Sequence, residues 1–211
     1  PSDAFALMDV IYRVKPDLII ELGTAGGGSS FFYAFIMQTY NPNSKVITMD
    51  PKRIADWNSH EINQICPHCR NAKETPLWKN GAIKFFKALP QDKISEVKDL
   101  IKLWGSKTIM VIEDGNHLTH TVTANIEAYA PFVTPGSYLV VQDTKMDMTN
   151  VIVNRYRPPA RPPLGEETEK GVSPRQALLK FLKTEEGRNF EVDRTPEYYI
   201  YSQHIHGFLK R

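Results

Sequence analysis

The chain has few cysteines, no long apolar run and almost no net charge, and each absence excludes a class of protein. Two cysteines in 211 residues are too few for a disulfide-stabilised scaffold. No apolar stretch approaches the roughly 18–20 residues of a membrane-spanning helix, so we expect no membrane contact. A formal net charge of +2 gives no electrostatic reason to expect a nucleic-acid partner. No signal peptide is visible, so we expect a cytoplasmic protein. Because the chain opens with Pro1 rather than Met, we also expect that a leading segment is missing.

The two cysteines form one short unit, Cys66-Pro-His-Cys69. Three interpretations apply to it: a free surface pair, half of a zinc site completed by His60, or a redox pair. A thioredoxin-type pair would follow a strand and open a helix, whereas the surroundings here are polar and loop-like. No second C-x-x-C is present to complete a metal site. A free surface pair is therefore the favoured interpretation, with the other two left open.

Short apolar runs alternate with segments that suit helices along most of the chain. We expect strands at residues 18–22, 45–49, 108–112, 138–141, 190–192 and 198–201, and a short strand within 83–89. We expect helices at 29–40, 94–103, 119–132 and 174–182. This alternation is typical of a parallel sheet covered on both faces. The length suits one domain over residues 1–211. Residues 145–173 are rich in proline and lack periodicity, which predicts a lid loop.

The most informative segment is 17–30, where an apolar run ends in an acid and then turns on glycines into an apolar segment. That order predicts a strand, a tight turn and a helix N-terminus, which together bring backbone N–H groups close to a ligand. The glycines do not have the G-x-G-x-x-G spacing of a dinucleotide site. They fit E-x-G-x-x-x-G instead, with Glu21, Gly23 and Gly27.

Polar side chains follow the other strands of the predicted sheet, where ligands of such sheets bind. Asp50 follows the second strand and is placed to accept hydrogen bonds from a ribose diol, the alternative being a solvated turn acid. Asp114 and Asp143 follow two adjacent strands, so we expect them side by side, where they could bind Mg²⁺. Such a cation would lower the pKa of a substrate hydroxyl. His117 is either a general base or a structural histidine at the start of the next helix.

Several motifs resemble one family. The E-x-G-x-x-x-G run resembles the first motif of class I S-adenosylmethionine (SAM)-dependent methyltransferases, in which the acid holds the methionine part of SAM. Residues 112–117 resemble the D-x-D-H element of the cephalosporin hydroxylase family, which is related to macrolide-sugar and rhamnosyl O-methyltransferases. Residues 130–144 resemble that family's A-P-L-V-x-P-G-x-Y-L-I-V-E-D-T, and residues 190–194 and 207–211 resemble its C-terminal signature.

The resemblance implies a fold, a reaction and a set of site residues. The fold would be the α/β, Rossmann-like class I methyltransferase fold, with a mostly parallel seven-stranded sheet and helices on both faces. The reaction would be SAM-dependent O-methyl transfer to a hydroxyl of a sugar or small natural product, assisted by Mg²⁺. The cofactor-binding residues would be Glu21, Gly23, Thr24, Ala25, Gly27, Ser29 and Asp50; the catalytic residues Asp114 and His117; and the metal ligands Asp114, Gln142 and Asp143.

The chain departs from the family pattern at two acids, which are replaced by Asn116 and Gln142. An amide carbonyl can still ligate Mg²⁺, but it adds no negative charge. A second hypothesis is therefore a SAM-binding protein with a decayed metal site and no turnover. A third is a redox protein that uses Cys66 and Cys69. The acceptor and the oligomeric state stay open, a homo-oligomer being one alternative.

Overall fold

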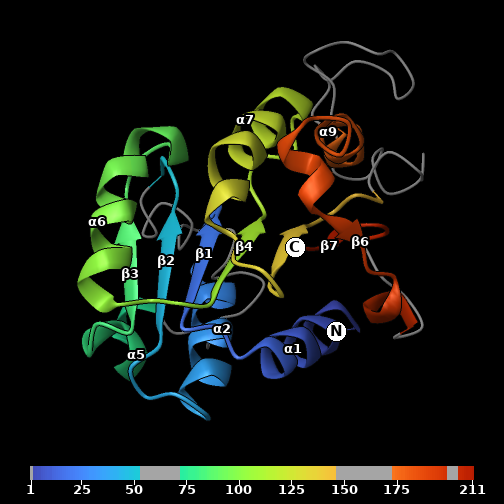
Figure 1. Cartoon of the computed structure of the whole chain (residues 1–211). Helices are drawn as coiled ribbons and strands as arrows, with labels where there is room; N and C mark the ends of the chain where they lie inside the picture. Colours follow the sequence, from blue (N-terminus) through green and yellow to red (C-terminus); the bar gives the residue numbers. More distant parts are fainter. Residues whose placement is uncertain (1, 53–71, 146–172, 199–203) are drawn as a thin grey trace, which may run out of the picture.

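The computed structural model describes residues 2–52, 72–145, 173–198 and 204–211. These residues form a seven-stranded sheet with the order β3-β2-β1-β4-β5-β7-β6 (Figure 1). The strands are β1 (Leu18–Leu22), β2 (Lys45–Met49), β3 (Ile83–Phe86), β4 (Ile109–Glu113), β5 (Tyr138–Val141), β6 (Glu191–Val192) and β7 (Phe208–Lys210). Strands β1 to β5 are parallel, and β7 runs antiparallel to both β5 and β6.

Helices cover both faces of the sheet. One face carries α1 (Ser2–Val14), α2 (Gly28–Gln38) and α5 (Pro76–Lys79), and the other carries α6 (Ile94–Trp104), α7 (Thr119–Tyr129) and α9 (Pro174–Phe181). Short 3₁₀ helices lie between them: η1 (Ala72–Glu74), η2 (Pro90–Lys93), η3 (Ala130–Phe132), η4 (Glu186–Asn189) and η5 (Thr195–Tyr198). The predicted architecture of a mostly parallel sheet between two helical layers is confirmed.

Side-chain alternation along the strands builds two separate cores. In β1, Ile19 packs toward α1 and α2, whereas Leu18 and Ile20 pack toward α6 and α7. Successive side chains of a strand point to opposite faces, so a strand buried on both faces is apolar throughout. The same alternation places Glu21 on the face of α1 and α2. An acid in a fully buried strand is costly and therefore marks a site.

Two predictions differ from the structure. The strand expected at 198–201 is wrong at its first residue, because Tyr198 ends η5 and is 82% exposed. Residues 199–201 lie outside the described residues, and among the described residues the last strand along the chain is β7. The helix expected at 119–132 ends as α7 at Tyr129 and continues as η3, since Pro131 has no N–H for an α-helical bond.

Helix α1 was not predicted, although its sequence carries a usable signal. Ala6, Leu7, Val10 and Ile11 are all buried, and their spacing is that of an apolar stripe on one helix face. Most of the proposed lid (146–172) and the pair Cys66 and Cys69 lie outside the described residues and stay predictions. Among the helices that the structure does describe, each is too short or too polar to cross a bilayer.

Candidate functional site

The turn between β1 and α2 has the geometry that its glycines predict. Gly23 and Gly27 adopt positive φ values of 112° and 81°, and Ala25 between them has φ 44°. The Gly27 N–H donates to the Thr24 carbonyl at 2.8 Å, which closes the turn just before α2 begins. The N-terminus of α2 therefore lies at the carboxyl end of β1, where its free N–H groups favour an electron-rich ligand.

Gly23 is required because the backbone of Asp114 leaves no room for a side chain at this position. A Cβ at this position would lie 2.0 Å from the backbone oxygen of Asp114. The sequence predicts that the glycine turn lies close to a ligand, and the structure shows that Gly23 first permits contact between the turn and the end of β4. In contrast, a Cβ at Gly26 or Gly28 would meet nothing within 4 Å. The contact at Gly23 fixes Asp114 beside the glycine turn.

Glu21 is a fully buried acid with one oxygen left open. Its Oε2 accepts hydrogen bonds from the hydroxyls of Ser30 and Thr48, the latter at 2.5 Å. Burial raises the pKa of Glu21 to about 6, although neighbouring hydroxyls partly offset the effect. Its Oε1 accepts no hydrogen bond from the residues that the structure describes. A buried acceptor without a donor is costly, so this oxygen is suited to a donor supplied by a ligand.

Asp50 braces the glycine turn from the end of β2. Its Oδ2 accepts the N–H groups of Thr24 at 3.2 Å and Ala25 at 3.0 Å, and its Oδ1 accepts the Lys52 N–H at 2.8 Å. The Thr24 hydroxyl also bonds the Thr48 hydroxyl at 2.6 Å. The carboxylate therefore holds the turn and still borders the adjoining cavity. Binding of a ribose, as expected from the sequence, remains a prediction.

A cavity of about 560 Å³ lies at the carboxyl ends of the strands. Six of the residues that the sequence singled out line it: Gly23, Ala25, Asp50, Asp114, Asn116 and His117. The other predicted site residues, Glu21, Thr24, Gly27, Ser29, Gln142 and Asp143, are not part of its lining. The cavity thus joins the glycine turn to the end of β4, which are the predicted cofactor and metal regions.

Asp114, His117 and Asp143 converge beside this cavity. One ligand atom from each lies within 4.8 Å of the other two, and His117 Nε2 is 3.4 Å from Asp143 Oδ2. The pKa of Asp114 is raised well above its usual range by burial and by the charges of Asp143, Glu21 and Glu113. Crowded carboxylates of this kind favour a proton or a cation between them.

Gln142 lies beside Asp114 but is engaged elsewhere. Its backbone N–H donates to the Glu113 carbonyl at 2.9 Å, which aligns it with Asp114 across β4 and β5. Its side-chain amide donates to the hydroxyl of Tyr33 in α2 at 3.0 Å. The predicted role of Gln142 as a metal ligand therefore depends on its carbonyl oxygen alone.

Glu113 is a buried acid that the sequence interpretation did not assign to the site. Its Oε1 accepts from the Asn125 amide at 2.9 Å and from the Gly115 N–H at 3.2 Å. Burial raises its pKa to about 7, with the Asp143 charge adding to the shift. The signal that could have found it is an acid at the last position of an otherwise apolar strand.

His204 supports Asp143 from a distant part of the chain. Its Nδ1 accepts the Asp143 backbone N–H at 3.0 Å, and its Nε2 lies 3.8 Å from Asp3 Oδ1. Burial lowers the pKa of His204, so the neutral ring that this hydrogen bond requires is favoured. Asp143 has φ 56°, an uncommon conformation for a residue with a side chain, and His204 helps to hold it. No local sequence pattern indicates this contact across 61 residues.

Replacing His204 with leucine should destabilise the protein more than replacing it with asparagine. Leucine and asparagine have side chains of similar shape, both branched at Cγ, but only asparagine offers an acceptor to the Asp143 N–H. An unsatisfied, partly buried N–H costs roughly 1–3 kcal/mol. Urea unfolding of both variants measures the difference. Equal stabilities would show that the hydrogen bond contributes nothing to holding this turn.

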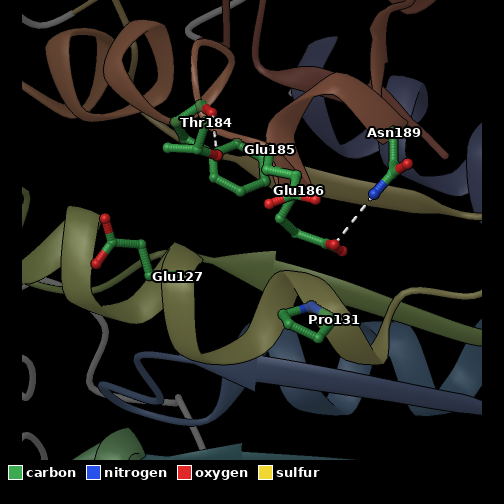
Figure 2. Close-up of a pocket in the computed structure, with 7 residues that line it drawn as sticks. Glu127, Pro131, Thr184, Glu185, Glu186 and Asn189 are labelled. Carbon is green, nitrogen blue, oxygen red and sulfur yellow. Dashed lines mark hydrogen bonds between the residues drawn. The ribbon is translucent and has the colours of Figure 1, made fainter.

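A second cavity, also of about 560 Å³, lies between η3 and α7 on one side and η4 on the other (Figure 2). Its lining includes Glu127, Glu185 and Glu186, and Figure 2 shows the Asn189 amide bonded to Glu186, at 3.1 Å. Arg211 also pairs with Glu186 at 3.0 Å. The predicted site residues are not part of its lining, so the chemistry that they imply belongs to the first cavity.

Comparison with known proteins places this arrangement in a family. The family model for rhamnosyl O-methyltransferase/CmcI matches residues 1–211. The rhamnosyl O-methyltransferase of Mycobacterium tuberculosis (strain ATCC 25618 / H37Rv) is 28% identical over 146 residues, which cover 69% of this chain and 53% of the relative. That of Mycobacterium leprae (strain TN) is 26% identical over 147 residues, covering 69% and 56%. The chain therefore spans about half the length of the curated relatives that it matches.

Solved structures share the fold over the whole chain. One described as "cmcI-N160 SAH" has a TM-score of 0.56 and 16% sequence identity, covering 100% of this chain and 77% of the other. One described as "cmcI-D160 Mg-SAM" has a TM-score of 0.55 and 17% identity, covering 100% and 71%. The family expected from the motifs is confirmed, as is the seven-stranded sheet. The chain belongs to the rhamnosyl O-methyltransferase/CmcI family and has the Rossmann-like fold of class I methyltransferases.

Proposed function

We propose that this protein is a SAM-dependent O-methyltransferase that acts on a hydroxyl of a sugar or another small natural product, with the help of a divalent cation. The family and the named function of its mycobacterial relatives support the reaction class. The observation that carries the proposal is the cavity that runs from the glycine turn to Asp114 and His117. One end suits a cofactor and the other suits deprotonation of an acceptor.

The residues around the glycine turn fit SAM. Asp50 lines the cavity at the end of β2 and can accept from ribose hydroxyls. Glu21 is buried behind the turn, outside that lining, so its open Oε1 would accept from the ammonium group of the methionine part only where the turn opens around the cofactor. The remaining residues that would hold the cofactor are Gly23, Thr24, Ala25, Gly27 and Ser29, which form or follow the turn. When bound, SAM supplies a reactive methyl group on a sulfonium ion.

The protein's own tasks are then alignment and deprotonation. The acceptor oxygen must approach in line with the bond that breaks, so the walls of the cavity must fix the acceptor. Asp114 and His117 line the cavity and are the candidates to take the hydroxyl proton. A divalent cation held by Asp114 and Asp143 would lower the pKa of that hydroxyl and orient it.

Calorimetry with SAM tests the proposal. We expect binding to the intact protein, followed by methyl transfer to a hydroxylated acceptor in the presence of a divalent cation. Absence of SAM affinity would contradict the whole assignment. SAM binding without turnover on any acceptor would favour the alternative, a binding protein whose metal site has decayed, for which the amides of Asn116 and Gln142 are the motivating observation.

The substitution Gln142→Glu should tighten Mg²⁺ binding by about tenfold. It adds a negative charge beside Asp114, and a charged carboxylate attracts a hard cation more strongly than an amide does. Titration calorimetry with Mg²⁺ measures the change. Gln38→Glu, which adds the same charge at the far end of α2, should leave Mg²⁺ affinity unaltered. If both variants match the parent protein, the side chain of residue 142 does not face the cation.

A further inference from the structure

We propose that His117 is the third metal ligand, together with Asp114 and Asp143, and that the site therefore prefers a first-row transition ion such as Mn²⁺ to Mg²⁺. The inference rests on the proposed function only in expecting a cation at this edge of the sheet. It differs from the sequence-based ligand set in exchanging Gln142 for His117, which adds a nitrogen donor.

The distances of the three side chains suit a shared cation. One atom each of Asp114, His117 and Asp143 lies within 4.8 Å of the others. The imidazole Nε2 and the Asp143 carboxylate oxygen are 3.4 Å apart. Ligands about 2.1 Å from a transition ion lie roughly 3 Å from one another, so this pair needs little movement to share one.

The two amides that replace family carboxylates are both engaged with the protein. The Asn116 Oδ1 accepts the Leu118 N–H at 3.1 Å, and the Gln142 amide donates to the Tyr33 hydroxyl at 3.0 Å. Neither residue brings a charge to the cation. The charged and nitrogen donors that converge here are those of Asp114, Asp143 and His117.

His117 is directed into the site by its backbone. It has φ 60° and lies between the end of β4 and the start of α7 (Thr119–Tyr129), and it lines the same cavity as Asp114. Asp143 has a similar φ of 56° and is held by His204. His117 and Asp143, which follow two different strands, thus both adopt an uncommon positive φ, and their side chains converge with that of Asp114.

The donor set determines the preferred ion. Mg²⁺ favours oxygen ligands and keeps several of its waters, whereas imidazole nitrogen binds transition ions much better. Two carboxylates and one imidazole should therefore select Mn²⁺, Fe²⁺ or Co²⁺ over Mg²⁺. With Nε2 on the ion, His117 is unable to accept the substrate proton, which leaves the carboxylate oxygen of Asp114 that is not on the ion as the proton acceptor.

Electron paramagnetic resonance with Mn²⁺ alone tests the ligand assignment on the whole chain without SAM. We expect the intact protein to bind Mn²⁺ at least tenfold more tightly than Mg²⁺ in competition. His117→Ala should weaken Mn²⁺ binding tenfold or more and change Mg²⁺ binding little. His120→Ala, an exposed histidine at the start of α7, is the matched control and should leave both affinities unchanged.

The outcomes separate the alternatives. Unchanged Mn²⁺ affinity in a folded His117→Ala protein overturns the proposal, as does equal preference for the two ions in the parent. Loss of Mn²⁺ affinity in Gln142→Ala but not in His117→Ala assigns the ligand to Gln142 and also overturns it. Should His117→Ala fail to fold, His117→Asn removes the nitrogen donor with a smaller change in size, and the same expected loss applies. SAM calorimetry on the same samples tests the proposed function separately.

Discussion

Replacing Gly23 with alanine should cost the protein at least about 3 kcal/mol of its free energy of unfolding, and abolish SAM binding. The added Cβ would lie 2.0 Å from the backbone oxygen of Asp114, an atom that a flexible side chain cannot move aside. The φ of 112° at this position is also one that residues with a Cβ rarely adopt. Relief of both problems requires the turn to separate from the end of β4. Urea unfolding measures the cost, and calorimetry measures SAM affinity.

Gly26→Ala is the matched control, three residues along the same turn. A Cβ at Gly26 would meet nothing within 4 Å. The unfolding free energy of the Gly26→Ala variant should therefore stay within about 0.5 kcal/mol of the parent value. Similar stabilities of the two variants would contradict the close packing at Gly23. A stable Gly23→Ala protein that still binds SAM would also show that the turn is not part of the cofactor site.

Glu21→Gln should abolish SAM binding and yet stabilise the protein without its cofactor. Burial raises the pKa of Glu21 to about 6, above the value of 4.5 for the free side chain. The folded state therefore holds the proton more tightly than the unfolded state does. The cost of the buried charge is absent below pH 4.5 and is complete above about pH 6. Removing the charge should then gain about 2 kcal/mol at pH 8 and almost nothing at pH 4.

Unfolding at the two pH values and SAM calorimetry test both parts of this prediction. Glu113→Gln is the comparison, because Glu113 is a second fully buried acid on the opposite face of the sheet, outside the predicted cofactor residues. It should also stabilise the protein at pH 8 but retain SAM affinity. Retained SAM affinity in Glu21→Gln would show that this acid is structural and that the cofactor binds elsewhere.

Most of the fold could be predicted because its signals are local. The apolar runs at 18–22, 45–49 and 138–141 coincide with strands β1, β2 and β5, and turn residues mark where these runs end or begin. The strand start expected at Tyr198 is wrong for the same reason, since an aromatic residue soon after Pro196 satisfies a strand pattern although Tyr198 is 82% exposed. Local composition does not say which apolar segment reaches the sheet, and here residues 208–210 do.

The site could be predicted only as far as the strand ends. Parallel strands bring Glu21, Asp50 and Asp114 to one edge, which the order of strands and helices implies. The partners of Asp143 could not be predicted, because His204 reaches it through the tertiary fold and not through sequence proximity. The orientation of Gln142 toward Tyr33 is likewise a result of helix packing on the sheet.

The antiparallel insertion of β7 between β5 and β6 means that the sheet is not completed in the order of synthesis. During translation, β5 emerges with an open edge, and among the described residues β6 pairs with β7 alone. An open strand edge can pair with other chains, so the nascent protein is exposed to aggregation until residues 208–210 leave the ribosome. The described segment 204–211, which contains β7, also brings His204 to Asp143. The strand ends that bear the candidate site and the edge of β5 that β7 covers should therefore become ordered in the same step of folding.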